Sequence, residues 1–88
     1  MKSRKKRVVL ITGGSRGIGK ACVDKFKLEG WQVATCATQI KNLKNSLADV
    51  TLKCDISKKN EVQATISRVI KTLGQIDVLI NNAGFDYF

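Results

Sequence analysis

Residues 8–19 have the sequence VVLITGGSRGIG, in which a short apolar run leads directly into a glycine-rich turn. The run Val8 to Ile11 is typical of a strand buried on both faces, as in a parallel sheet. A helical apolar period begins at Gly17. Its inward face is expected to hold Ile18, Ala21, Cys22 and Phe26. The stretch therefore predicts a strand, a tight turn and a helix, in that order.

A strand that runs straight into a helix leaves the first N–H groups of the helix unpaired, and these donors form an anion site with the helix dipole. Gly13 is expected to make the turn, Gly17 to let a pyrophosphate approach the backbone, and Gly19 to let the helix pack on the sheet. The spacing Gly-x-x-x-Gly-x-Gly differs from the common Gly-x-Gly-x-x-Gly. A purely structural turn is the alternative, but the position between a predicted strand and helix favours dinucleotide binding.

The rest of the sequence repeats this alternation. Further strands are expected at residues 32–37, 50–54 and 76–80. The apolar spacing of Ile40, Leu43 and Leu47 predicts a short helix. A longer helix, with Ser57 as its cap, is expected to bury Val62, Ile66, Val69, Ile70 and Leu73. Gly30 and Gly74 are placed to end the two longer helices.

The order βαβαβαβ predicts an α/β fold with an open parallel sheet and right-handed crossovers. The expected strand order is 3-2-1-4, which is a partial, Rossmann-type doubly wound sheet. Residues 1–7 are interpreted as a basic N-terminal arm, and residues 8–88 as the N-terminal portion of an NAD(P)-binding Rossmann domain. The third crossover should put its helix alone on the second face, so an uncovered apolar surface is expected there.

The net charge is +9, from 16 Lys and Arg against 7 Asp and Glu, and the first seven residues hold five of the positive charges. Such an arm can bind nucleic acid or an acidic membrane surface. No aromatic residue interleaves these charges, so a solvated terminus is favoured and nucleic acid is not the expected partner. No apolar run approaches the ~20 residues of a membrane helix, and residues 1–7 lack the apolar stretch that is typical of a secretory signal. We therefore expect a cytoplasmic protein without a membrane partner.

The three cysteines are Cys22, Cys36 and Cys54, and the chain has no histidine. No two cysteines have the spacing of a ligand pair, so no metal site is expected. An odd number argues against a disulfide framework, and the interpretation is three small apolar residues in a reducing compartment.

Two segments, TGGSRGIG at residues 12–19 and DVLINNAG at residues 77–84, resemble the signatures of the short-chain dehydrogenase/reductase family. They are separated by about the distance that the family uses, and the resemblance covers the whole chain after the basic arm. Within the family, the segments are most similar to 3-oxoacyl-[acyl-carrier-protein] reductases. The resemblance implies an oxidoreductase with a dinucleotide cofactor, and the finer similarity implies a role in fatty acid biosynthesis.

The resemblance also implies roles for individual residues. The pyrophosphate and adenosine ribose would be surrounded by Gly13, Ser15, Arg16, Gly17, Ile18 and Gly19. Asp55 and Ile56 would lie beside the adenine, with the Asp55 carboxylate accepting from its amino group. The cofactor near the second ribose would be lined by Asn82, Ala83 and Gly84. For Asn81 and Asn82 the alternative is a pair of mutual hydrogen bonds that fix a turn.

The end of the second strand predicts which cofactor is preferred. NAD enzymes place Asp or Glu there to bind the adenosine 2′-hydroxyl. This chain has Ala37 and then Thr38, with no carboxylate between Gly30 and Asp49. Arg16 can hold a 2′-phosphate with its charged fork, and Thr38 can add a hydroxyl. The sequence therefore predicts that NADP(H) is preferred over NAD(H).

The family's catalytic serine, tyrosine and lysine follow the Asn-Asn-Ala-Gly segment, where this chain has only residues 85–88. Tyr87 is the sole tyrosine and no lysine follows it, so no catalytic residue is assigned. We interpret the chain as the N-terminal part of an NADPH-dependent carbonyl reductase whose substrate is a small-molecule ketone or acyl thioester, such as a 3-oxoacyl thioester. The full-length form is expected to be a homo-oligomer. A dinucleotide-binding module without catalysis, and nucleic-acid binding through the basic arm, remain alternatives.

Overall fold

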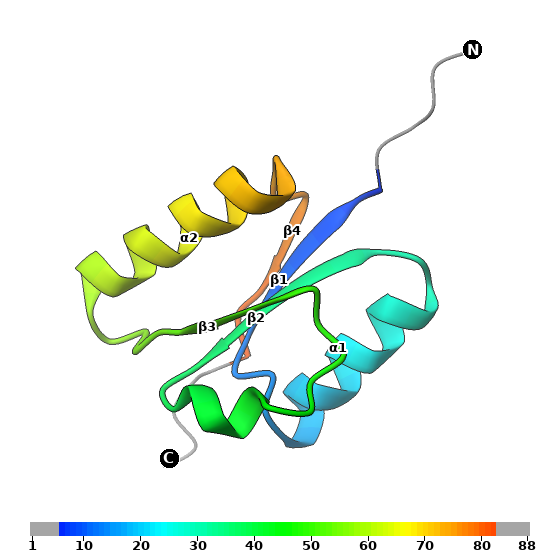
Figure 1. Cartoon of the computed structure of the whole chain (residues 1–88), viewed down its shortest axis with the longest axis horizontal. Helices are drawn as coiled ribbons and strands as arrows, with labels where there is room; N and C mark the ends of the chain where they lie inside the picture. Colours follow the sequence, from blue (N-terminus) through cyan, green and yellow to red (C-terminus); the bar gives the residue numbers. More distant parts are fainter. Residues whose placement is uncertain (1–5, 83–88) are drawn as a thin grey trace.

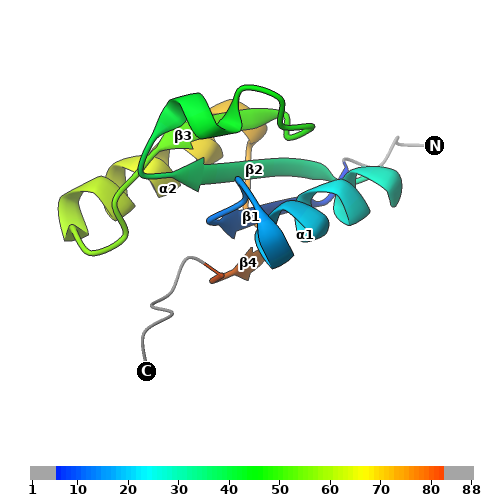
Figure 2. The ribbon, with the colours of Figure 1, turned by 90° about the horizontal axis from the view of Figure 1, so that it is seen from below.

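The computed structural model describes residues 6–82. Its elements, in chain order, are β1 (Val8–Thr12), α1 (Gly17–Leu28), β2 (Gln32–Ala37), the 3₁₀ helix η1 (Ile40–Leu43), β3 (Val50–Lys53), α2 (Lys59–Leu73) and β4 (Val78–Ile80). The strands form one parallel sheet in the order β3-β2-β1-β4, which confirms the predicted fold class and strand order. The helix α1 covers one face of the sheet and α2 lies against the other (Figures 1 and 2).

The core has two halves because side chains of β1 alternate between the two faces of the sheet. Val9 and Ile11 pack with Val33 and with Val23 of α1. Val8 and Leu10 pack on the other side with Ala34 and with Val69 of α2. All five residues of β1 are buried, because β1 is a central strand with a helix on each face. This explains why its sequence is a continuous apolar run rather than an alternating one.

The inward face of α1 differs from the prediction at two positions. Ile18 is 76% exposed, and Ala21 is exposed as well. Cys22 and Phe26 pack inward as expected, together with Val23. The phase of the helix is set at its first turn, where Gly19 lies against the backbone of Gly13. That contact turns Ile18 toward solvent.

The start of α2 also differs from the prediction. Lys58, and not Ser57, is the N-cap, and it makes no side-chain capping bond. The Ser57 hydroxyl instead donates to Asp55 Oδ1 at 2.7 Å. Gly74 ends α2 with a φ of 93°, as expected, and Gly30 follows α1 with a φ of 89°. The predicted helix through Leu47 forms only the short η1, because the chain turns at Lys44.

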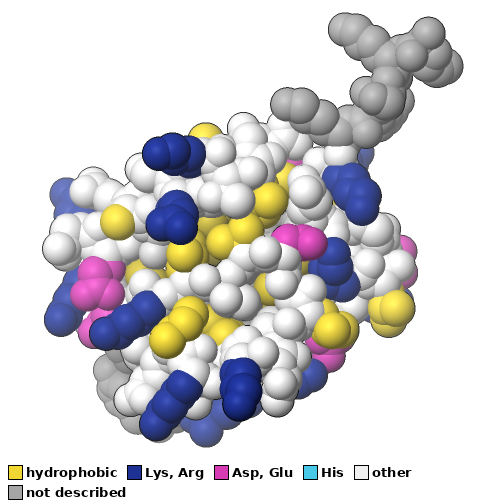
Figure 3. Space-filling view, viewed as in Figure 1, with side chains coloured by type: hydrophobic (Ala, Val, Ile, Leu, Met, Phe, Trp, Pro, Cys, Tyr) yellow, Lys and Arg dark blue, Asp and Glu magenta, His cyan; other side chains and the backbone are white. Residues whose placement is uncertain are grey.

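An apolar surface lies beside α2 at the outer strand of the sheet. Leu79 of β4 is 54% exposed and Ile70 of α2 is 46% exposed, although Ile70 was expected on the buried face. Figure 3 shows yellow side chains reaching the surface beside α2. The topology predicts this surface, since α2 is the sole helix on its face among residues 6–82. Within this range no helix has the length and apolar character needed to cross a membrane.

Asp49 joins the segment before β3 to both α1 and β2. Its Oδ2 accepts from the Val33 N–H at 2.7 Å, and its two oxygens lie 3.0 and 3.1 Å from Lys27 Nζ. Burial opposes ionisation of this carboxyl, but the bonds from Val33 and Lys27 outweigh it and hold its pKa below the usual range. The ionised form is therefore bound more tightly in the folded chain than in the unfolded chain.

We expect the free energy of unfolding to fall as the pH is lowered below about 4, because unfolded Asp49 takes up a proton at a higher pH than folded Asp49 does. Asp49→Asn should cost about 1 kcal/mol at pH 7, the size of a partly exposed, charge-assisted hydrogen bond. The substitution should also make the free energy of unfolding depend less steeply on pH in the acid range. Urea unfolding between pH 3 and pH 7 measures both effects, and an unchanged pH dependence in the variant would contradict this role.

Candidate functional site

The carboxyl ends of the four strands meet at one edge of the sheet, as they must in a parallel sheet (Figure 1). The turn between β1 and α1 lies at this edge, and so do the segments that follow β2, β3 and β4. Ligands of open α/β sheets bind at such edges, where the crossover direction changes. The direction changes here at β1, since α1 and α2 lie on opposite faces.

Gly13 and Gly17 have positive φ angles, of 70° and 59°. The Gly13 N–H donates to the Cys36 carbonyl at 2.9 Å, which attaches the turn to β2. A Cβ added at Gly17 would meet no atom within 4 Å. The backbone at the amino end of α1 is therefore open on its outer side, and it fits a group that must come close to the N–H donors there.

Gly14 and Gly19 are closely packed instead. A Cβ at Gly14 would overlap the side chains of Thr35 and Val23. A Cβ at Gly19 would overlap the Gly13 carbonyl oxygen and the Asn82 side-chain amide. These two glycines bring the turn and α1 against the sheet. This role of Gly14 was not predicted, although its position next to Gly13 in the turn was a signal.

The side chains of Asn81 and Asn82 bond to β1 and its turn, and not to each other. Thr12 Oγ1 donates to Asn81 Oδ1 at 3.3 Å, and Asn82 Nδ2 donates to the Gly13 carbonyl at 3.1 Å. These bonds tie the end of β4 to the glycine turn. The alternative of mutual hydrogen bonds is therefore wrong. Asn81 and Thr12 were missed as residues that support the site, although the predicted strand order, which places β1 beside β4, was the signal that could have found them.

Asp55 follows β3 and places a negative charge at the edge of the sheet where the carboxyl ends of the strands meet. Its carboxylate accepts from the Ser57 hydroxyl at 2.7 Å and from the Ser57 N–H at 3.0 Å. These two bonds hold the pKa of the carboxyl below its usual range. The Asp55 N–H in turn donates to Glu61 Oε1 at 2.9 Å, so the first turn of α2 positions this loop. Asp55 is thus an ionised acceptor at neutral pH.

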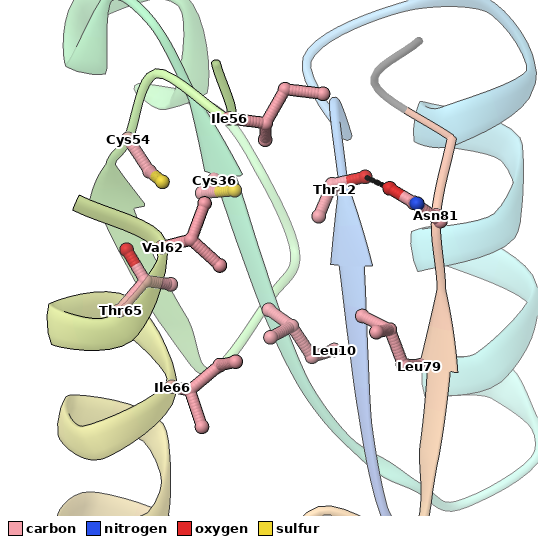
Figure 4. A pocket seen from close by; sticks show the side chains of 10 residues that line it. All are labelled: Leu10, Thr12, Cys36, Cys54, Ile56, Val62, Thr65, Ile66, Leu79 and Asn81. Carbon is pink, nitrogen blue, oxygen red and sulfur yellow. Dashed lines mark hydrogen bonds between the residues drawn. The ribbon is translucent and has the colours of Figure 1, made fainter. Parts of the chain in front are cut away.

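Ile56 lines an apolar cavity of about 200 Å³ between α2 and the sheet. The other lining residues are Leu10, Thr12, Cys36, Cys54, Val62, Thr65, Ile66, Leu79 and Asn81. Figure 4 shows Ile56 above Thr12 and Asn81, at the end of the cavity where the strands end. Burial, with the neighbouring Cys54, raises the pKa of the Cys36 thiol to about 11. Burial thus favours the protonated form of the Cys36 thiol in the wall of this cavity.

The remaining predicted site residues flank the glycine turn. Arg16 is the N-cap residue of α1 and is exposed, with an extended backbone. Ser15 lies half-buried in the turn, and Thr38 is exposed directly after β2. Ala83 and Gly84 lie outside the described residues. The structure thus brings the predicted residues from 13 to 56, and Asn82, to one edge of the sheet.

The chain matches the short chain dehydrogenase family over residues 7–87. It is 38% identical over 82 residues to carbonyl reductase family member 4 of Xenopus tropicalis, covering 89% of this chain and 35% of that protein. A variant of the actinorhodin polyketide ketoreductase, solved with NADPH, superposes with a TM-score of 0.84 at 31% identity, over 91% of this chain and 34% of that one.

A second solved structure is the 3-ketoacyl-(acyl-carrier-protein) reductase of Brucella melitensis complexed with NADH. Its TM-score is 0.86 at 28% identity, over 94% of this chain and 36% of that chain. The chain spans about a third of the length of the curated relatives that it matches first.

Proposed function

Because this chain belongs to the short-chain dehydrogenase family, we propose that it is the cofactor-binding part of an NADPH-dependent carbonyl reductase. The observation that carries the proposal is the backbone at Gly17, which has a positive φ and open space beside it at the amino end of α1. Glycine is required there for the conformation, and a ligand that approaches the helix N–H groups would use the space.

The pyrophosphate would lie against the first turn of α1, over Gly17 and Ile18. Ile18 is a large apolar residue that is 76% exposed at this terminus, which a bound dinucleotide would cover. Gly13, Ser15 and Arg16 would contact the adenosine ribose from the turn. Gly19 would support the pyrophosphate site indirectly, because its close packing keeps α1 near the sheet.

The adenine would lie beside Asp55 and Ile56. The ionised Asp55 carboxylate can accept from the exocyclic amino group, and the Ile56 side chain offers an apolar surface for the ring. Asn82, with Ala83 and Gly84, would border the second ribose. When bound, the nicotinamide supplies the hydride, and the residues of this chain bind and orient the cofactor. The substrate of the whole protein would be a ketone, such as a 3-oxoacyl thioester.

We expect NADP⁺ to bind the 88-residue chain at least about tenfold more tightly than NAD⁺. Ala37 puts no carboxylate against a 2′-phosphate, and Arg16 forms no ion pair within residues 6–82, so its guanidinium is available to an anion. Titration calorimetry with the two cofactors measures the ratio. Arg16→Gln should lower it by weakening NADP⁺ binding, with NAD⁺ binding nearly unchanged. Tighter binding of NAD⁺ by the unmodified chain would overturn the preference.

A further inference from the structure

Two cysteine thiols that are far apart in the sequence lie together in the cavity between α2 and the sheet. Cys36 belongs to β2 and Cys54 directly follows β3, and both line the cavity. The parallel register pairs Cys36 with Leu52, and the Cys54 N–H donates to the Ala37 carbonyl at 2.9 Å. Cys54 is therefore two residues beyond the partner of Cys36, and this even offset puts both side chains on the face that α2 covers. Figure 4 shows the Cys54 sulfur directed toward Cys36.

The diagonal offset separates the two backbones by more than a direct disulfide spans. Diagonal neighbours on adjacent strands have Cα atoms about 7–8 Å apart, whereas a disulfide joins Cα atoms that are at most about 7 Å apart. The thiols themselves are close: burial is the main cause that raises the pKa of the Cys36 thiol, and a hydrogen bond between the two thiols adds to it. The pair therefore suits one atom placed between the two sulfurs better than an S–S bond.

The surroundings of the thiols favour a bridging atom that leaves no net charge. Among residues 6–82, no group of three or more His, Cys, Asp and Glu side chains is placed to hold a metal ion, so the two sulfurs are the only ligands of this kind. Both cysteines are buried, and a charged bridge such as copper(I) between two thiolates would carry a large desolvation cost there. Trivalent arsenic that carries one organic group is soft, forms two bonds to sulfur and stays neutral.

The rest of the cavity has room for the organic group. The cavity volume is about 200 Å³, and a protein cavity of about 150 Å³ with apolar walls binds benzene. The walls beyond the cysteines include Leu10, Val62 and Ile66, which offer apolar contacts to a ring. Leu79 also lines the cavity and is 54% exposed, so the cavity reaches the surface beside β4. A phenyl group on arsenic therefore fits beside the two thiols.

We propose that Cys36 and Cys54 together form a binding site for trivalent arsenicals that carry one organic group. In the reaction with R–As(OH)₂, each thiol gives its proton to a departing hydroxide. Two As–S bonds form, two As–O bonds and two S–H bonds break, and two water molecules leave. Arsenic stays trivalent, so the step needs neither an oxidant nor a reductant. Capture of the arsenical needs no dinucleotide, and it is therefore independent of the proposed function.

Phenylarsine oxide, which water converts to phenylarsonous acid, tests the site on the reduced 88-residue chain. Intact-mass spectrometry should show one adduct per chain, heavier by one phenylarsenic group less two hydrogen atoms. The number of free thiols should fall from three to one, and peptide mapping should identify the remaining thiol as Cys22. Excess glutathione should leave the adduct in place, because the second As–S bond is intramolecular. The dithiol dimercaptopropanol should remove it.

Single substitutions test whether both sulfurs are needed. Cys36→Ala and Cys54→Ala should each weaken binding by at least about 100-fold, since one thiol alone loses the intramolecular second bond. Cys22→Ala is the matched control and should bind as the unmodified chain does. Cys22 packs with Val9 and Ile11 in the half of the core that α1 covers, on the opposite face of the sheet. Urea unfolding without the arsenical shows whether each variant is folded.

Three results would overturn the site. The first is the absence of an adduct when the folded, unmodified chain is mixed with an equal amount of phenylarsine oxide. The second is an adduct that leaves Cys36 or Cys54 free, or that glutathione removes. The third is undiminished binding by a folded Cys36→Ala or Cys54→Ala variant. If these two variants do not fold, the thiol count and the peptide map of the unmodified chain decide the question.

Discussion

Gly19→Ala is expected to lower the free energy of unfolding by about 1–3 kcal/mol and to abolish dinucleotide binding. The added Cβ would overlap the carbonyl oxygen of Gly13 and the side-chain amide of Asn82. Relief requires α1 to move away from the sheet, or the hydrogen bond from Asn82 to Gly13 to break. Either movement displaces the N–H donors at the amino end of α1. Urea unfolding and titration with NADPH measure the two effects.

Gly30→Ala is the control for this substitution. Gly30 also belongs to a turn next to α1, but a Cβ there would meet no atom within 4 Å. Its φ of 89° leaves only backbone strain, of about 1–2 kcal/mol, and no effect on the site. NADPH binding by Gly19→Ala at the affinity of the unmodified chain would refute the role of close packing at this position.

Gly17→Ala is expected to weaken NADPH binding by at least about 100-fold, with a loss of stability close to that of Gly30→Ala. Gly17 and Gly30 both have a positive φ, and in both cases a Cβ would enter open space. The two substitutions therefore impose similar strain on the folded chain. They differ in location, because the space beside Gly17 is where we place the pyrophosphate, and a methyl group there keeps the phosphate away from the N–H donors.

This pair of variants separates binding from folding. Chemical unfolding should show similar stabilities for Gly17→Ala and Gly30→Ala, while calorimetry with NADPH should show a loss for Gly17→Ala alone. If both variants bind NADPH equally well, the open space at Gly17 is not the pyrophosphate site.

The position of the turn was predictable because it depends on local signals, and the strand order was predictable from the alternation of strands and helices with right-handed crossovers. The continuous apolar run of β1 indicates a central strand, and the glycines at 30 and 74 end their helices as expected. The phase of α1 was not predictable from apolarity. It depends on the contact of Gly19 with Gly13, which joins residues that are neighbours only after the turn has formed.

The start of α2 also depends on a contact that the sequence does not display. Ser57 has the residue type of a helix cap, but its hydroxyl bonds to Asp55, so the loop that holds Asp55 competes with the cap.

The central claim is that the edge formed by the glycine turn and the ends of the neighbouring strands binds a dinucleotide. Titration of the ¹⁵N-labelled chain with NADP⁺, followed by two-dimensional NMR, tests it directly. We predict saturable shifts of the backbone amides of residues 13–19, 38–41 and 55–56 and of Asn82, with small shifts over residues 62–73 of α2. The absence of saturable shifts at residues 13–19, or shifts confined to α2 and its cavity, would contradict the claim.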